Sequence, residues 1–126
     1  MGLTRESLLK PLPVDIEEVP IPEMGGSVWV KGMTVRERNI FERQFQSLKG
    51  ERLQKRMSEI RQRMLVACVC DEKGEPLLTK HDIDEIGKQR ADIVERLVTV
   101  AQRVCGWSDQ DVDQMAKNSE ETNEDS

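Results

Sequence analysis

Apolar residues recur every three or four positions in the central and C-terminal parts of the chain, and this spacing predicts amphipathic helices. The most regular stripe begins at Ile93 and ends at Cys105, where Gly106 supplies the expected C-terminal stop. Strand-type patterning is confined to the N-terminal third. We therefore predict a mainly α fold: a small helical domain with a short N-terminal β-hairpin or extended segment and a disordered acidic C-terminal tail.

The N-terminal third predicts a short helix followed by two extended pieces. Thr4 is a suitable N-cap for the helix, which Pro11 and Pro13 end quickly. Residues 14–21 are extended but flanked by prolines, so a strand there must lie at a sheet edge. Residues 27–31, Ser-Val-Trp-Val-Lys, form the clearest strand of the chain. The two extended pieces could pair as a hairpin.

Two helices are predicted in the central part. The first opens at a capping box made by Thr34 and Glu37, and Gly50 is expected to break it. Its apolar stripe is made by Phe41, Phe45 and Leu48. The second continues to Cys70, where an end that is apolar all round should be buried. Its apolar face comprises Leu53, Met57, Ile60, Met64 and Ala67, and its opposite face Arg52, Lys55, Arg56, Arg61 and Arg63.

The remaining part predicts a turn, a short helix and the long C-terminal helix. Residues 71–74 form the turn, and Thr79 caps a short helix that Gly87 ends or bends. Ser108 with Asp111 begins one more short helix. We expect one mostly helical domain over residues 1–117, followed by a disordered acidic tail over residues 118–126.

Composition is consistent with a single small domain. The chain has 126 residues and only 3% aromatic residues, so its core must be built mainly from aliphatic side chains. Net charge is −5 but uneven: residues 1–30 carry −3, residues 31–65 carry +6 and residues 66–126 carry −8. This segregation fits solvated helix faces, or charge complementarity between subunits or with a partner, and both interpretations stay open.

The residues that could carry chemistry do not form a recognisable catalytic arrangement. His81 is the single histidine, and Cys68 with Cys70 lacks two further ligands at the spacing of a metal site. We predict no enzyme, no cofactor and no metal. No run of about 18 apolar residues predicts a membrane helix, and no apolar signal region opens the chain. The three cysteines resemble reduced cytosolic thiols.

Nucleic-acid binding is an alternative that the basic segment 31–65 raises, because phosphate contacts need only a basic face. Four glutamates interrupt that face, and Phe41 and Phe45 belong to the apolar stripe rather than to a stacking platform. A small DNA-binding regulator is therefore less favoured than a protein-binding role.

Three blocks of sequence together resemble the tail assembly chaperones of long-tailed bacteriophages, of the siphophage or prophage type. The first block contains L-T-R-E-S-L-L and then P-E-M-G-G-S-V-W-V-K-G-M, leading into T-V-R-E-R. The second is R-M-L-V-A-C-V-C-D-E-K-G-E-P-L-L-T-K-H-D-I, and the third is A-D-I-V-E-R-L-V-T-V-A-Q-R-V running into G-W-S-D-Q-D-V. The resemblance covers roughly residues 3–117 and departs from the family's pattern at Leu78, where an aromatic residue is expected.

The resemblance implies a protein that works in the host bacterial cytoplasm and is absent from the mature virion. Such chaperones bind the tape-measure protein, keep it soluble and bring tail-tube subunits to it. A structural tail completion or connector protein is the alternative. We expect a homo-oligomer and no membrane partner. Candidate partner-binding residues are Trp29, Arg36, Arg43, Arg52, Arg56 and Trp107, and a core role stays open for each tryptophan.

The resemblance also implies a longer form, made when the ribosome slips back one nucleotide, that contacts the tail-tube protein. Ala116, Lys117 and Asn118 can be encoded GCA-AAA-AAC, which contains the slippery heptamer A-AAA-AAC. The protein sequence permits this heptamer, although Ala has other codons. We predict that this chain is the short, unshifted form.

Overall fold

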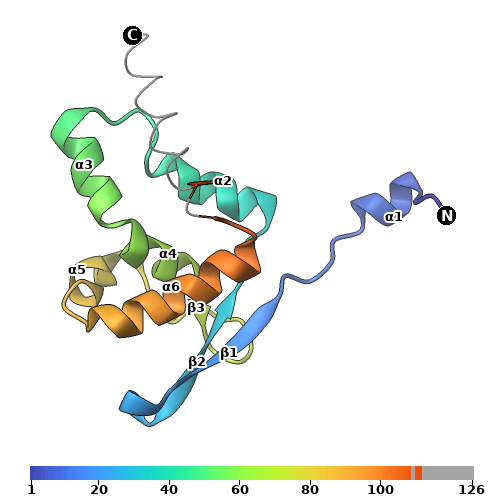
Figure 1. Ribbon diagram of the computed structural model, residues 1–126. Coiled ribbons are helices and arrows are strands. Elements are labelled where there is room, and N and C mark those ends of the chain that lie inside the picture. The colour runs from blue at the N-terminus through green and yellow to red at the C-terminus, as the bar shows by residue number, and fades with distance from the viewer. Residues whose placement is uncertain (109, 112–126) are drawn as a thin grey trace.

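The computed structural model describes residues 1–108 and 110–111. Within them, helices gather on one side of a small antiparallel sheet in the strand order β1-β2-β3 (Figure 1). The strands are β1 (Ile16–Ile21), β2 (Gly26–Lys31) and β3 (Val69–Cys70). The α-helices are α1 (Arg5–Leu9), α2 (Val35–Arg43), α3 (Gly50–Ser58), α4 (Ile60–Cys68), α5 (Ile83–Ile86) and α6 (Ala91–Cys105), and the 3-10 helices are η1 (Pro22–Met24) and η2 (Lys80–Asp82). The predicted mainly α fold is confirmed.

The N-terminal hairpin forms as the sequence predicts. β1 and β2 pair antiparallel with Val19 opposite Val28, and Gly25 closes the turn at a φ of 76°, which favours glycine. β1 lies at the sheet edge, where the missing N–H of Pro20 costs no ladder bond. Val19 and Val30 are buried on the face that packs against the helices.

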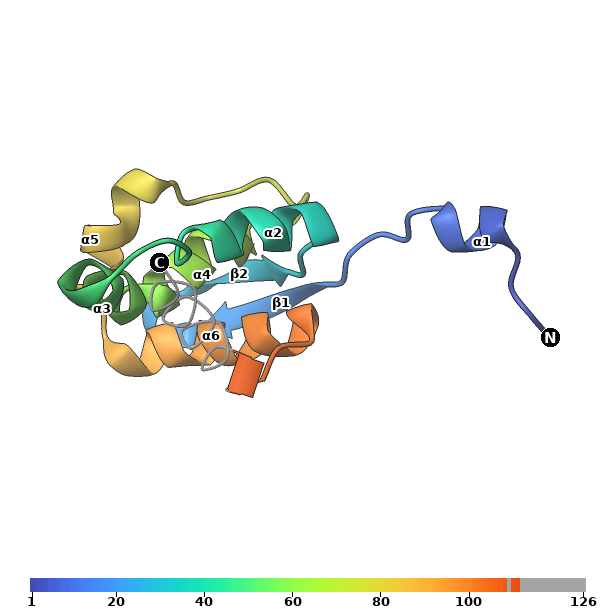
Figure 2. The same ribbon diagram turned by 90° about the horizontal axis from the view of Figure 1, so that it is seen from above.

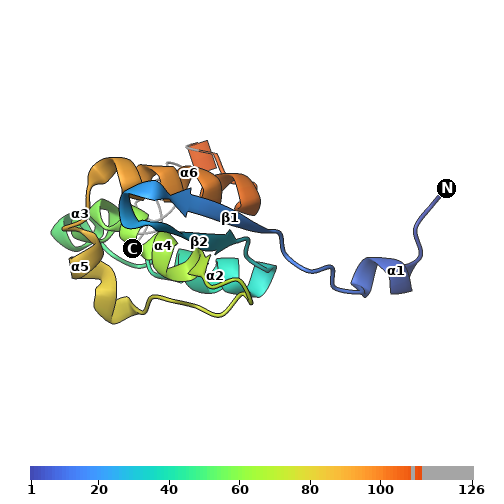
Figure 3. The same cartoon turned by 90° about the horizontal axis from the view of Figure 1, so that it is seen from below.

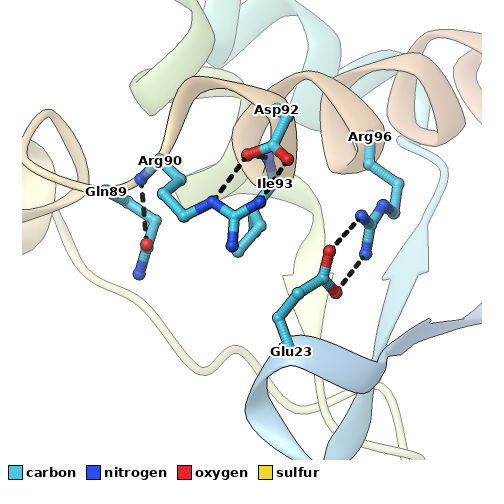
Figure 4. A network of polar contacts seen from close by, with 6 residues as sticks. All are labelled: Glu23, Gln89, Arg90, Asp92, Ile93 and Arg96. Carbon is cyan, nitrogen blue, oxygen red and sulfur yellow. Dashed lines mark hydrogen bonds and ion pairs between the residues drawn. The ribbon is translucent and has the colours of Figure 1, made fainter.

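Ion pairs fasten this hairpin to α6, and Figure 4 shows the one between Glu23 and Arg96. The two carboxylate oxygens of Glu23 in η1 accept hydrogen bonds from Arg96 at 2.9 and 2.6 Å. Glu17 in β1 forms a second ion pair with Arg103 at 2.8 Å. Because the two pairs lie at different points along α6, together they fix the angle between helix and hairpin.

Predicted helix boundaries are confirmed where a capping residue marks them. Thr34 accepts a hydrogen bond from the Glu37 N–H and donates its own N–H to the Glu37 carboxylate, which completes the capping box of α2. Thr79 forms the same arrangement at η2. α6 ends at Cys105 and is capped by Gly106, whose φ is 72°. Each of these caps depends on residues that are close in the sequence, so tertiary packing does not change the helix ends that they predict.

The end of α2 differs from the prediction. Phe41 and Phe45 are both buried as expected, but α2 ends at Arg43 and Phe45 reaches the core from the following turn. Ser47 has a φ of 64° in that turn, and Leu48 beyond it is only partly buried. The chain thus reverses before Gly50, which opens the next helix instead of breaking the previous one.

A single helix up to Cys70 was the wrong prediction. The helix is interrupted at Glu59, between α3 and α4, and it stops at Cys68. Val69 and Cys70 leave the helix as β3 and pair with β2. The expected burial is confirmed, since β3 is fully covered. Helical periodicity cannot separate a buried helix end from a buried strand, and the β-branched Val69 favours the strand.

Three aromatic rings form the centre of the helical layer. Phe41 packs edge-on against Phe45 with ring centroids 5.4 Å apart, and Trp107 lies 5.1 Å from Phe41. The guanidinium of Arg38 covers the Trp107 ring at 4.6 Å. Three of the four aromatic residues of this chain, all except Trp29, therefore lie in its core, around which the aliphatic side chains of α4 and α6 pack.

The N-terminal arm, residues 1–13, lies away from this body. Figures 1, 2 and 3 all show α1 at the end of an extended segment that leaves β1, well separated from the other helices. Thr4 caps α1 as predicted, and every residue of the arm is exposed.

The C-terminal predictions fall largely outside the described residues. Ser108 and Asp111 exchange the hydrogen bonds of a helix start, as expected. The predicted tail and the codons of Ala116, Lys117 and Asn118 lie beyond that point. Among the described helices, none combines the length and the apolar character needed to cross a membrane.

Candidate functional site

A cleft with a basic lining lies between α3 and the η2–α5 segment. Its volume is about 590 Å³. Five basic and two acidic side chains line it, whereas the whole chain carries −5. The lining residues are Leu48, Arg52, Lys55, Arg56, Glu59, Arg63, Lys80, His81, Ile83 and Asp84. We call this the basic cleft.

The spacing of the basic residues on α3 explains one wall. Arg52, Lys55 and Arg56 stand at i, i+3 and i+4, which places them on one face of a helix. Arg56 donates a hydrogen bond to the Gln44 carbonyl oxygen at 2.7 Å and so holds the turn after α2. Arg52 and Lys55 form no ion pair within residues 1–108 and 110–111, which leaves both charges available to a ligand.

The opposite wall comes from η2. The capping box at Thr79 starts this short helix and thereby presents Lys80 and His81 to the cleft. Lys80 also lacks an ion pair in the part of the chain that the structure describes. Two elements far apart in the sequence therefore supply cations to the same space.

Arg63 marks the inner end of the basic cleft. Its Nη1 donates to the Gln44 Oε1 at 2.8 Å and its Nη2 to the Glu59 Oε1 at 3.0 Å. The Nε atom is buried and has no acceptor among the described residues.

An apolar groove continues from this point between α2 and α4. It has a volume of about 260 Å³ and shares Arg63, Lys80 and Ile83 with the basic cleft. Its apolar lining consists of Met33, Ile40, Phe41, Val66, Ala67 and Ile83, and its other lining residues are Glu37, Gln44, Arg63 and Lys80. Ile40 is 56% exposed, although it is a large aliphatic side chain. The basic cleft and the apolar groove therefore form one continuous surface that is charged at one end and apolar at the other.

The structure brings together only some of the candidate partner-binding residues. Arg52 and Arg56 lie side by side in the basic cleft. Arg36 and Arg43 are exposed on α2 and line neither space. Their separation follows from the reversal of the chain after α2.

The two candidate tryptophans have different positions. Trp107 is 5% exposed in the core, which is the alternative that the sequence left open. Trp29 is half-buried and alternates in β2 with Val28 and Val30, so it lies on the sheet face turned away from the helices. Neither ring lines the basic cleft.

Sequence reasoning missed Lys80 and His81 as cleft residues. A lysine and a histidine in a first helical turn look like ordinary surface positions. Only the packing of η2 against α4 shows that they face Arg52 and Arg56. The capping motif at Thr79 located the helix but could not indicate its neighbour.

The cysteines are reduced thiols. Cys68 Sγ and Cys105 Sγ lie 3.8 Å apart. The hydrogen bond with Cys105, together with burial, raises the pKa of Cys68, and the same hydrogen bond lowers the pKa of Cys105. Burial raises the pKa of Cys70. No group of His, Cys, Asp and Glu side chains within the described ranges could hold a metal ion.

Comparisons with known proteins give one informative result. No family model matches the sequence, and a search of curated proteins finds no match. The solved structure of the bacteriophage HK97 tail assembly chaperone is similar to this chain, with a TM-score of 0.54 at 13% sequence identity. The match covers 71% of this chain and 84% of that one. The chain therefore shares a fold with that chaperone.

Proposed function

We propose that this protein is a tail assembly chaperone of a long-tailed bacteriophage. The fold shared with the HK97 tail assembly chaperone carries this proposal, because it is independent of the three sequence blocks that resemble the same family. Fold alone does not define function, so the basic cleft and the apolar groove must account for the activity.

The proposed client is the tape-measure protein, held through a helical segment with acidic and apolar sides. Helix-in-groove binding needs an apolar channel with charges along its border, and the groove beside the basic cleft has that form. Arg52, Lys55 and Lys80 would pair with carboxylates of the client. Apolar client side chains would enter the groove, where Met33 allows adaptable contacts. Covering those side chains keeps the client from aggregating.

The remaining features of the proposal follow the family. The chaperone brings tail-tube subunits to the tape-measure protein through a longer frameshifted form, self-associates in the host cytoplasm and is absent from the virion. Reading codons 116–118 of the gene tests the frameshift: without a slippery run or an overlapping downstream frame, this part of the proposal fails. Finding the protein in purified particles would instead favour a tail completion or connector protein.

Co-expression with the tape-measure protein of the same genome tests the central claim. We expect the client to be soluble with the wild-type chain and largely insoluble with the double variant Arg52→Glu/Lys55→Glu. The matched control is Arg36→Glu/Arg43→Glu, which makes the same change in net charge on α2 outside the cleft. Client that stays insoluble with the wild type contradicts the proposal, and equal loss with both variants removes the cleft from it.

The basic cleft also raises nucleic-acid binding, and a mobility shift at low salt tests it. The cleft is lined by no Phe, Tyr or Trp side chain, and the imidazole of His81 is its one ring, so it lacks the large aromatic platforms on which successive bases stack. We expect no shift of DNA or RNA. A shift that the Arg52→Glu/Lys55→Glu variant abolishes would overturn the choice of a protein client.

A further inference from the structure

The N-terminal arm exposes four leucines. Leu3, Leu8, Leu9 and Leu12 are 80%, 74%, 59% and 85% exposed. Exposed large aliphatic side chains gathered in one short segment mark an interaction surface. α1 has only five residues, too few for a helix to be stable in water without packing. The arm therefore needs a partner surface.

The linker directs the arm away from its own body. Lys10 ends α1 in an extended conformation, and Pro11 and Pro13 follow with φ fixed by their rings. The residue before each proline is also held extended. Such a linker favours a contact with another molecule over a return to the same chain, and Figure 2 shows the arm pointing outward from β1.

The apolar groove between α2 and α4 is the complementary surface. Most of its lining side chains are apolar, and one of them, Ile40, is 56% exposed. We propose that the apolar groove of one copy receives the leucines of the N-terminal arm of a second copy. Leu8 and Leu9 on α1, with Leu12 just beyond, would bury against Ile40, Val66 and Ile83.

This contact joins two different surfaces, so it is head-to-tail. Each chain in a pair keeps one free arm or one free groove, and further copies can add. The neighbouring basic cleft would then recur in every copy along the assembly. Self-association is part of the proposed function, and this contact names its surfaces. The contact forms without the client, and because apolar client side chains are proposed to enter the same groove, the client would compete with the arm for it.

Sedimentation velocity of the full chain at increasing concentration tests the contact. The wild type should grow in mass with concentration. An arm variant, Leu8→Ser/Leu9→Ser, and a groove variant, Ile40→Glu, should each stay at the 14.5 kDa of a monomer, with apparent Kd raised at least tenfold. Both changes are on exposed side chains, so circular dichroism should be unchanged. Matched controls are Arg5→Ser on the arm and Met24→Glu, also 56% exposed, at the hairpin tip.

Mixing the two variants makes the test specific. The arm variant keeps an intact groove and the groove variant keeps an intact arm, so together they should form a complex of twice the monomer mass and no more. A wild type that stays monomeric, or a mixture that fails to associate, overturns the proposal. Loss of client solubility with Ile40→Glu, without any change in self-association, would leave the groove to the client alone and overturn the arm contact.

Discussion

The bidentate pair between Glu23 and Arg96 gives a pH-dependent contribution to stability. Arg96 lowers the pKa of Glu23 to about 2 from 4.5. A depressed carboxyl pKa stabilises the fold above pH 4.5, and this contribution is lost as pH falls towards 2. We expect Glu23→Gln to lower the Tm at pH 7 and the difference from wild type to shrink between pH 4.5 and pH 2. Thermal unfolding followed by circular dichroism measures it.

Glu18 supplies the control for this pair. It is an exposed carboxylate on the same hairpin and forms no ion pair within the described ranges. Glu18→Gln should leave the Tm nearly unchanged at both pH values. If Glu23→Gln lowers the Tm equally at pH 7 and pH 3, the carboxylate charge is not the stabilising element.

Cys105 should be the first of the three thiols to react. The thiolate is the nucleophile, and the hydrogen bond with Cys68 lowers the pKa of Cys105. Burial and raised pKa values protect Cys68 and Cys70. Alkylation with iodoacetamide, followed by peptide mass spectrometry, should label Cys105 first. Labelling of Cys70 at the same rate would contradict this.

At the scale of the elements, local signals were predictive and junctions between elements were not. Thr34, Thr79 and Gly106 marked helix ends because a cap acts through neighbouring residues. The change to β3 at Val69 depends on tertiary pairing with β2, and no local signal in the sequence marks the interruption at Glu59. The pattern of apolar positions identified which residues are buried there, but not the backbone that buries them.

Gly106 offers a test of a cap at this scale. Its φ of 72° is unfavourable for a residue with a side chain, although a Cβ would meet no atom within 4 Å. We expect Gly106→Ala to lower the free energy of unfolding by about 1 kcal/mol. Gly26→Ala is the matched control, because Gly26 has equal space without a positive φ, and it should be close to neutral. Urea denaturation distinguishes them, and equal effects would contradict the backbone explanation.

For the whole molecule, the uneven charge is partly balanced inside one chain. Arg61 of the basic segment pairs with Glu95 on α6, and Arg96 and Arg103 pair with acidic residues of the hairpin. Sequence could show the segregation but not these pairings. The sequence also could not locate the basic cleft, because Arg52 of α3 and Lys80 of η2 are far apart in the sequence and line the same cleft only in the folded chain.

Client binding through the unpaired cations of the cleft and self-association through the leucines of the arm should differ in their dependence on salt. Exposed charge pairs are screened over about 10 Å at 0.1 M salt and about 3 Å at 1 M, whereas burial of leucine is not weakened. Raising NaCl should therefore weaken client binding several-fold while self-association of the client-free chain stays constant or strengthens. Fluorescence anisotropy of the labelled client and sedimentation velocity measure the two processes.

The variant Arg52→Gln/Lys55→Gln should bind the client weakly with a flatter salt dependence. If self-association weakens as the NaCl concentration rises, charge complementarity between subunits, rather than the arm, holds the copies together.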